Sequence, residues 1–323
     1  MNLEIKRFRI LGLHYYQDFD IVFDESIKIL VGENGLGKTT VLNALYYTLT
    51  MRWHILEDIG FDFIELYIND QIIEFSHSDL ENYLIVKKGF LKSTHSHEQF
   101  ASLGEYIHKF ILFEEILENI SHKIVYFPVN RNIENQMETF GLGLHTIINS
   151  EVKARKRKKG THNEDFEALI ERMSILKDTI IKLNMEDVER MFADSKASIS
   201  LMEHFINVCN QYLVTTEFYI NKNRIDLEVR NKKTKEEVSL RQLSSGEKQI
   251  VYIFTKIFLS RQDDLIVLFD EPELSLSMLW QKKLLVDIVN SKKCSFLFAV
   301  THSPFVFKNE LDKYAIGMNV YID

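Results

Sequence analysis

Cysteine is scarce in this sequence, and long apolar runs are absent. Only two cysteines, Cys209 and Cys294, occur among 323 residues, and they lie far apart. This excludes a disulfide-stapled scaffold or a cysteine-rich zinc site and fits a reducing intracellular compartment. No stretch approaches the roughly 18 apolar residues of a membrane span, and the opening MNLEIKRFRI lacks the apolar core of a signal peptide. We therefore expect a cytoplasmic protein that does not enter the membrane.

The chain also lacks an excess of positive charge. It has 39 lysines and arginines against 47 aspartates and glutamates, a formal net charge of -8. Bulk attraction to nucleic acid or anionic lipid is therefore not expected, and any such contact needs a local cationic patch. The hydrophobic share of 46% and the charged share of 27% are ordinary for a folded globular chain. The length allows one large domain or two smaller ones.

The apolar pattern predicts an α/β fold. Strands are expected where β-forming residues alternate or cluster, and helices where apolar residues recur every three or four positions. The first half is predicted to contain helices at 39–50 and 98–117, a hairpin around Asn69-Asp70, and strands at 3–10, 19–23, 27–31, 83–86 and 124–127. The second half is predicted to contain a helix after Ser245 and strands at 216–220, 225–229, 265–270 and 295–300. The last two are continuous apolar runs, typical of central strands in a parallel sheet.

A shift in composition predicts a three-part organisation. Lysines and arginines cluster at 153–159, and the polar stretch GTHNED follows. From Asp165 to about Tyr212 there is no proline or glycine, and apolar residues step by threes and fours, which predicts a helical insertion. We therefore expect an N-terminal lobe at 1–149, a basic linker with a helical insertion at 150–214, and a C-terminal lobe at 215–323.

The most specific motif is a glycine-rich turn between a strand and a helix. GENGLGKT fits the P-loop pattern of glycine, four residues, glycine, lysine, then serine or threonine. In such a loop the backbone N–H groups face the β-phosphate, the lysine reaches the β- and γ-phosphate oxygens, and the threonine ligates Mg²⁺. A plain glycine turn into a helix is the structural alternative. The predicted nucleotide-binding residues are Gly32, Asn34, Gly35, Gly37, Lys38, Thr39 and Thr40.

A second motif supplies two carboxylates. LIVLFDE at 265–271 is an apolar strand that ends in Asp270 and Glu271. Asp270 is predicted to hold the magnesium ion together with Thr39, and Glu271 to polarise the attacking water. The alternative is that both carboxylates cap a following helix. Their occurrence together with the P-loop favours the catalytic interpretation.

Two further motifs complete an ordered set. LSSGEKQ at 243–249 precedes an apolar helical run, and its serine and glycine suit either phosphate binding or simple capping. Thr301-His302-Ser303 follows the apolar strand 295–300. A lone histidine at a strand end is more often structural, but its place as the fourth motif makes His302 a candidate catalytic residue.

These four motifs resemble those of ATP-binding-cassette ATPases. There, LSSGEKQ corresponds to the signature motif, usually LSGGQ, while Asp270 and Glu271 correspond to Walker B and His302 to the switch histidine. Other phrases resemble the SMC, RecF and OLD-like branch, especially small ATPases of bacterial anti-phage systems such as Septu PtuA. These phrases are LEIKRFRI, VGENGLGKTTVLNAL, YFPVNRNIE, DEPELSLSMLWQKKLL and THSPFVF.

The resemblance implies a P-loop ATPase head with a mixed central sheet, an N-terminal antiparallel β-subdomain and a helical insertion. It implies ATP and Mg²⁺ as cofactors and Glu271, Lys38 and His302 as catalytic residues. Each ATP would lie between the P-loop of one subunit and the signature of another, formed by Ser244, Ser245, Gly246 and Glu247. In this branch an arginine of the first strand often touches the phosphates. Arg9 matches best and Arg7 is close, with a solvated strand charge as the alternative.

The sequence departs from the family pattern in several places. Ser245 replaces the second signature glycine and Glu247 the glutamine, both of which are common in this branch. Ser275-Leu276-Ser277-Met278 stands where relatives often have SLHP, which puts communication between two ATP sites in doubt. Gln136 is a candidate for the glutamine that senses magnesium. Only a short tail follows His302, so we expect no nuclease domain of the OLD type.

Three classes of function stay open. The leading one is an ATPase whose ATP-dependent dimerisation, or higher assembly, controls a partner effector, expected to be a nuclease, or nucleic-acid binding in anti-phage defence. The cationic cluster 153–159 is then a DNA or RNA contact, or else a solvated linker. The second is a non-hydrolysing nucleotide sensor that restrains a toxic partner. The third, a transporter ATPase subunit, is disfavoured by the long interval between Gly37 and Ser244.

Overall fold

The chain separates into two compact units, each treated by itself below. The first comprises Met1–Val129, Gln262–Leu274 and Gln281–Asp323, and the second comprises Asn130–Arg261 and Ser275–Trp280. The computed structural model describes residues 4–14, 16–90, 97–129, 195–221, 226–239, 242–258, 260 and 262–322. The cationic cluster 153–159, Gln136 and most of the expected insertion lie outside these residues. The predicted boundaries near 149 and 214 therefore stay a prediction.

A five-stranded parallel sheet lies in the first unit, in the order β11-β3-β10-β9-β6. Its strands are β3 (Ile27–Val31), β6 (Ile124–Phe127), β9 (Leu265–Asp270), β10 (Cys294–Thr301) and β11 (Ala315–Gly317). All of β9 and the last six residues of β10 are buried. This is the burial expected of central strands covered on both faces, so the interpretation of the two apolar runs is confirmed.

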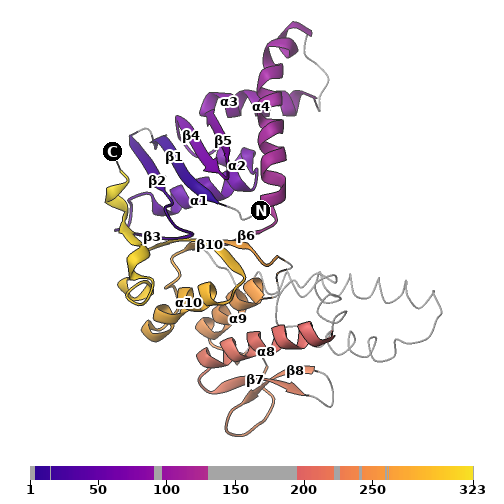
Figure 1. Ribbon diagram of the computed structural model, residues 1–323, viewed down its shortest axis with the longest axis vertical. Helices are drawn as coiled ribbons and strands as arrows, with labels where there is room; N and C mark the ends of the chain where they lie inside the picture. The colour runs from indigo at the N-terminus through magenta and orange to yellow at the C-terminus, as the bar shows by residue number, and fades with distance from the viewer. Residues whose placement is uncertain are drawn as a thin grey trace, which may run out of the picture. The chain divides into compact units, whose positions relative to one another are not determined.

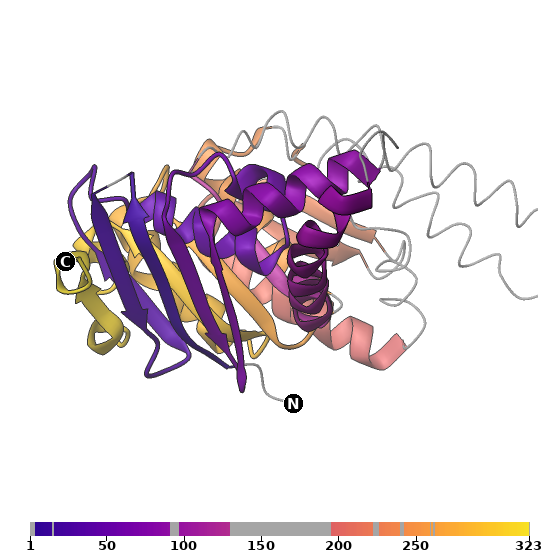
Figure 2. The same ribbon diagram turned by 90° about the horizontal axis from the view of Figure 1, so that it is seen from above.

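The first unit also contains a four-stranded antiparallel sheet, in the order β2-β1-β4-β5. Its strands are β1 (Ile5–Leu13), β2 (Gln17–Val22), β4 (Phe63–Ile68) and β5 (Gln71–Ser76), and Figure 2 shows them side by side. Phe8 and Ile10 are fully buried, because alternate residues of a strand face the same side. The hairpin turn needs no glycine because Asn69 adopts a φ of 51°, a region that asparagine tolerates.

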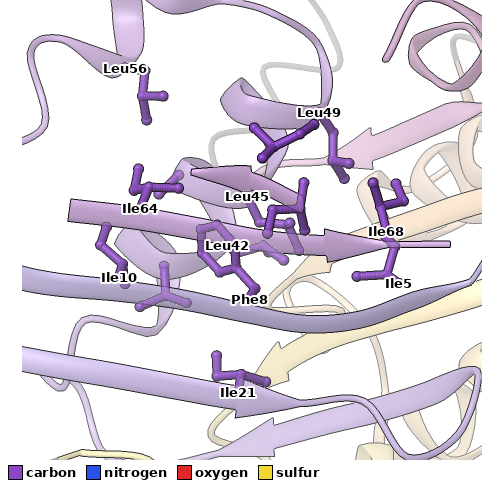
Figure 3. Packing of buried hydrophobic residues seen from close by; sticks show 14 of the residues in the cluster. Ile5, Phe8, Ile10, Ile21, Leu42, Leu45, Leu49, Leu56, Ile64 and Ile68 are labelled. Atoms are coloured by element: carbon purple, nitrogen blue, oxygen red, sulfur yellow. The ribbon is translucent and has the colours of Figure 1, made fainter. Parts of the chain in front are cut away.

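Helix α1 (Lys38–Leu49) contributes to one core with both sheets (Figure 1). Its buried face carries Val41, Leu42, Leu45 and Leu49. Figure 3 shows Leu42 and Leu45 among the side chains of Phe8 and Ile64 from the antiparallel sheet. Leu268 and Val300 of the parallel sheet belong to the same cluster. The α/β class and the N-terminal antiparallel β-subdomain are therefore as predicted, with the parallel and antiparallel pairing in separate sheets.

Of the other helices described in this unit, the sequence pattern predicted only the one at 98–117. They are α2 (Trp53–Leu56), α3 (His77–Phe90), α4 (His97–Ser121), and the short η3 (Pro304–Val306), η4 (Asp312–Tyr314) and η5 (Met318–Val320). The predicted strand at 83–86 is wrong, because it lies inside α3. The Tyr83 ring stacks on Phe110 of α4 at 4.5 Å, and its hydroxyl donates to Glu114 at 2.8 Å. This tertiary packing overrides the β-propensity of the segment.

The second unit contains α8 (Ser195–Tyr212), β7 (Thr216–Asn221), β8 (Asp226–Asn231) and α9 (Ser245–Phe258). β7 and β8 form an antiparallel pair. Tyr212 of α8 contacts Phe254 of α9 at a ring distance of 5.4 Å, and Trp280 at 5.9 Å. Trp280 belongs to α10 (Met278–Asn290), which continues in the first unit. Across the described residues, no helix combines the length and apolarity needed to cross a membrane.

The burial of β9 predicts a large cost for shortening its side chains. Leu268 is 0% exposed, so Leu268→Ala should lower the free energy of unfolding by about 2–5 kcal/mol. Leu279→Ala makes the same chemical change at a side chain that is 74% exposed and should shift it by no more than about 0.5 kcal/mol. Urea denaturation followed by circular dichroism measures both. Equal midpoints would contradict the central position of β9.

Candidate nucleotide-binding site

The P-loop joins the end of β3 to the start of α1 through two left-handed glycines. Gly35 has a φ of 87° and Gly37, the residue that caps α1, has a φ of 81°. Side chains strain this conformation, and a Cβ on Gly37 would lie 3.3 Å from Phe19 Cζ. Asn34 and Gly35 are exposed, whereas Gly32 and Thr40 are half-buried. The loop thus has the backbone form that suits a phosphate at a helix N-terminus.

Lys38 is the first residue of α1, and 5% of its surface is exposed. Its Nζ donates to the carbonyl oxygens of Gly32 at 2.7 Å and Glu33 at 2.6 Å. Burial lowers the pKa of the Lys38 ammonium, and the carboxylates of Glu271, Asp270 and Glu273 oppose that shift. The fold therefore brings the P-loop cation and the acidic residues at and after the end of β9 within electrostatic range of each other.

Thr39 and Asp270, which lie far apart in the sequence, are joined by a hydrogen bond. Thr39 Oγ1 donates to Asp270 Oδ1 at 3.1 Å, and Asp270 is fully buried at the end of β9. A hydroxyl and a carboxylate are hard oxygen ligands, and Mg²⁺ is commonly bound by one or two such groups together with the phosphates of a nucleotide. The donor chemistry of this pair fits a nucleotide-bound magnesium ion.

Glu271 and His302 come together from neighbouring strands. Glu271 has a φ of 45°, uncommon for a residue with a side chain, and its backbone N donates to Val300 O at 2.9 Å. Its Oε1 lies 3.6 Å from Nδ1 of His302, whose side chain is 45% exposed at the end of β10. The proposed base and the proposed switch histidine therefore share one edge of the parallel sheet.

Glu273 is a residue of this site that the sequence did not reveal. Its carboxylate is buried and accepts hydrogen bonds from Thr301 Oγ1 at 2.7 Å, His302 N at 3.0 Å and Ser303 N at 3.2 Å. The available signal was the second acidic residue of DEPE together with the polar triplet THS after an apolar strand. Their pairing depends on the register of β9 and β10, which the sequence alone does not supply.

The signature segment lies in the second unit and forms a capping box at the start of α9. Ser244 N and Oγ donate to Glu247 Oε2 at 2.9 and 2.8 Å, and Glu247 N donates to Ser244 Oγ at 3.3 Å. Ser244 and Ser245 are exposed. A Cβ on Gly246 would lie 2.7 Å from Ser275 O, so this position requires glycine for close backbone approach. The capping contacts expected as the structural alternative are thus present.

Arg9 lies opposite Asp20 and Glu65 in the antiparallel sheet. Its neighbour Arg7 forms a bidentate pair with Asp20, with Nε at 2.6 Å from Oδ1 and Nη2 in contact with Oδ2. The hydrogen bond from Arg7 lowers the pKa of Asp20. Among the described residues, no hydrogen bond or ion pair joins Arg7 or Arg9 to the P-loop. The assignment of Arg9 to the phosphates stays a prediction.

A comparison with protein families identifies the class of this chain. A family described as "AAA domain, putative AbiEii toxin, Type IV TA system" matches residues 144–308, just over half of the sequence. The chain belongs to this family. The match includes the signature, Asp270, Glu271 and His302 and begins after the P-loop. Membership in an AAA-domain family implies nucleotide binding, which agrees with the geometry around Lys38 and Thr39.

Curated relatives match a short segment of this AAA-domain protein. The DNA replication and repair protein RecF of Clostridium kluyveri is 42% identical over 43 residues, 13% of this chain and 12% of that protein. RecF of Desulfitobacterium hafniense is 44% identical over 48 residues, 15% of this chain and 13% of that protein. The matched segment therefore spans about an eighth of these relatives, and the likeness to RecF is local.

Solved SMC heads are similar across most of the chain but at low scores. The Smc head of Pyrococcus furiosus, with an extended coiled coil and bound to the C-terminal domain of ScpA, has a TM-score of 0.46 and 13% identity. The comparison covers 95% of this chain and 92% of that one. The SMC head domain of Thermotoga maritima has a TM-score of 0.42 and 11% identity, and the comparison covers 94% of this chain and 91% of that one. At TM-scores below 0.5 these likenesses carry no argument about function.

The P-loop geometry predicts the effect of removing its cation. Lys38→Ala should reduce ATP affinity by roughly 10² or more, because the β- and γ-phosphates lose the lysine that compensates their charge. Isothermal calorimetry with Mg²⁺ and ATP measures this. Lys313→Ala, at an exposed lysine of the same unit, is the matched control and should bind as the wild type. Unchanged affinity in Lys38→Ala would refute the assignment.

Proposed function

We propose that this AAA-domain protein binds and hydrolyses ATP as a P-loop ATPase of the SMC and RecF type. One observation carries the proposal: the P-loop Thr39 contacts Asp270, 231 residues later, at 3.1 Å, beside the buried Lys38. A plain glycine turn gives no reason for a buried carboxylate at this place. The family membership and the local likeness to RecF support the same class of activity.

The roles of the side chains follow from their positions. Lys38 and the N–H groups at the start of α1 would bind the β- and γ-phosphates. Thr39 and Asp270 would hold a magnesium ion, which neutralises phosphate charge when bound. Glu271, beside them at the end of β9, would accept a proton from the attacking water. His302, with an accessible ring, would contact the γ-phosphate.

ATP is proposed to join two copies of the chain, with Ser244, Ser245, Gly246 and Glu247 acting on the nucleotide of the partner subunit. The exposed hydroxyls of Ser244 and Ser245 at the start of α9 support this, because a helix N-terminus attracts a phosphate. Met278 and Leu279 are also exposed. Large apolar side chains beside the loop Ser275–Ser277 support an interface with a second copy, or a higher oligomer.

The cycle of assembly and release is proposed to control an effector, with a nuclease as the expected partner, or to control binding of DNA or RNA. The family description as a putative AbiEii toxin of a type IV toxin–antitoxin system supports a role in defence. The sequence phrases that resemble Septu PtuA favour the same role. The curated name of RecF supports DNA as the nucleic acid. The cationic cluster 153–159 is the proposed contact.

A nucleotide sensor that restrains a toxic partner without hydrolysis is the second candidate. Two observations favour it. Ser244 and Glu247 already satisfy each other in a capping box. The loop after Glu271 also has Ser277 where relatives often have histidine. Such a protein would bind ATP and assemble, but the bound ATP would persist.

Replacing the proposed base separates the two candidates. Glu271→Gln keeps the size of the side chain but cannot accept a proton, so ATP should bind normally while hydrolysis falls by roughly 10² or more. Phosphate release and light scattering should then show a persistent ATP-bound dimer. The control Glu310→Gln changes an exposed glutamate of the same unit. Wild-type turnover in Glu271→Gln would show that Glu271 is misassigned, and absent turnover in the wild type would favour the sensor.

Mixing two inactive variants tests the shared site. Lys38→Ala disables a P-loop and Ser244→Ala a signature, so each should be inactive alone. If the motifs meet across a dimer, a mixed dimer retains one intact pair, and mixing should restore part of the ATPase activity. Ser239→Ala is the control for removing an exposed serine hydroxyl from the second unit. Failure of every mixing ratio to restore activity would argue against action across subunits.

A further inference from the structure

The carboxylate of Glu273 has no role in the chemistry proposed above, yet it lies at the centre of the most densely bonded polar cluster described at this site. Only 6% of the residue is exposed. Thr301 Oγ1 lies 2.7 Å from both of its oxygens and donates to them. The backbone N–H groups of His302 and Ser303 donate to Oε1 at 3.0 and 3.2 Å. Three consecutive residues, beginning with the last residue of β10, are therefore held by one side chain.

The same oxygen also faces the ring of the candidate switch histidine. Glu273 Oε1 lies 3.1 Å from Nδ1 of His302, within hydrogen-bond distance, whereas Glu271 Oε1 lies at 3.6 Å from the same atom. An ionised carboxylate can only accept a hydrogen bond, so the proton of a neutral imidazole belongs on Nδ1. Nε2 then carries the lone pair and can take up a proton. In the imidazolium that results, Nε2 is a donor available to an anionic ligand while Nδ1 keeps its contact with Glu273.

Gln281 adds a second connection between the same two segments. Its Nε2 donates to the backbone oxygen of Glu273 at 3.4 Å, and its Oε1 accepts from Ser303 Oγ at 2.8 Å. Ser303 Oγ in turn accepts from Phe305 N at 3.4 Å at the start of η3. The backbone on both sides of His302 is thus fixed, and the remaining freedom of the residue is mainly rotation of its ring, which the Nδ1 contact restricts.

We propose that Glu273 is a positioning residue that holds Nδ1–H of His302 and turns Nε2 toward the γ-phosphate, to which Nε2 donates once the ring is protonated. The inference rests on the proposed ATP site for the identity of the ligand. The tautomer itself is a property of the chain without nucleotide. Because Glu273 is the nearer of the two carboxylates, the distances assign the orientation of His302 to Glu273. Glu271 keeps its proposed role as the base that accepts a proton from the attacking water.

Nitrogen NMR of the histidine side chains tests the tautomer directly. The full chain is labelled with ¹⁵N-histidine, and the His302 signals are identified by their loss in His302→Gln. We expect the neutral ring to carry its proton on Nδ1. In Glu273→Gln an amide that can donate as well as accept replaces the carboxylate, so the proton should shift toward Nε2, while Glu310→Gln should leave the spectrum unchanged. A wild-type ring protonated on Nε2, or no change in Glu273→Gln, would overturn the proposal.

A double-mutant cycle in the ATPase reaction tests the same link through function. Loss of a residue that orients another typically costs about 10–100-fold, so Glu273→Gln should lower kcat by that factor with ATP affinity unchanged. The double variant Glu273→Gln with His302→Gln should be no slower than His302→Gln alone, because Glu273 acts through the histidine. Glu273→Asp, which keeps the charge, should recover part of kcat and of the Nδ1–H signal.

The outcomes separate this inference from the proposed function. Losses that multiply in the double variant would show that Glu273 acts independently of His302 and would overturn the inference. If the wild-type chain hydrolyses no ATP, the proposed hydrolysis fails while the NMR measurement still decides the role of Glu273. Calorimetric ATP binding by each variant serves as the check that the site remains folded.

Discussion

The parallel register of β3, β9 and β10 is the constraint on which the candidate site depends. Thr301 of β10 pairs with Val31 of β3, and Val300 pairs with Asp270 of β9. Parallel strands end at the same edge of a sheet, so the residues that follow them lie close together. These residues are the P-loop after β3, Glu271 after β9 and His302 after β10. A slip of one residue would turn each side chain of β9 to the opposite face of the sheet and separate Asp270 from Thr39.

The charges collected at this edge are costly to bury, and the fold compensates each of them differently. Burial lowers the pKa of Lys38, but three carboxylates act in the opposite direction, and two loop carbonyls accept its hydrogen bonds. Asp270 accepts a hydrogen bond from the hydroxyl of Thr39. Glu273 accepts hydrogen bonds from two backbone N–H groups and from the hydroxyl of Thr301. Buried ionised groups persist only with such partners. The polar cluster is therefore a requirement of the fold as well as a candidate for chemistry.

Local patterns predicted the elements of the site but not all of their contacts. The P-loop and the strands β9 and β10 could be predicted because glycine spacing and continuous apolar runs are local properties of the sequence. The segment 83–86 was misassigned because its β-forming residues pack in α3 against Phe110, a contact with a distant helix. The role of Glu273 could not be predicted, because its hydrogen-bond partners lie about thirty residues later in the chain and are brought beside it only by the pairing of β9 with β10. The position of Arg9 opposite Asp20 likewise depends on how β1 pairs with β2, which local patterns do not supply.

The segment Ser275–Trp280 belongs to the second unit, whereas the residues on either side of it in the sequence belong to the first. Glu273 and Gln281, which flank this segment in the sequence, hold His302 and Ser303. Within the segment, Ser275 O and Trp280 leave no room for a side chain on Gly246, and Ser275 itself adopts a φ of 59°. The flanking residues thus contact the region of the histidine within the first unit, and the segment itself contacts the N-terminus of α9 within the second. Because both ends are close-packed, neither can move without disturbing its own neighbours.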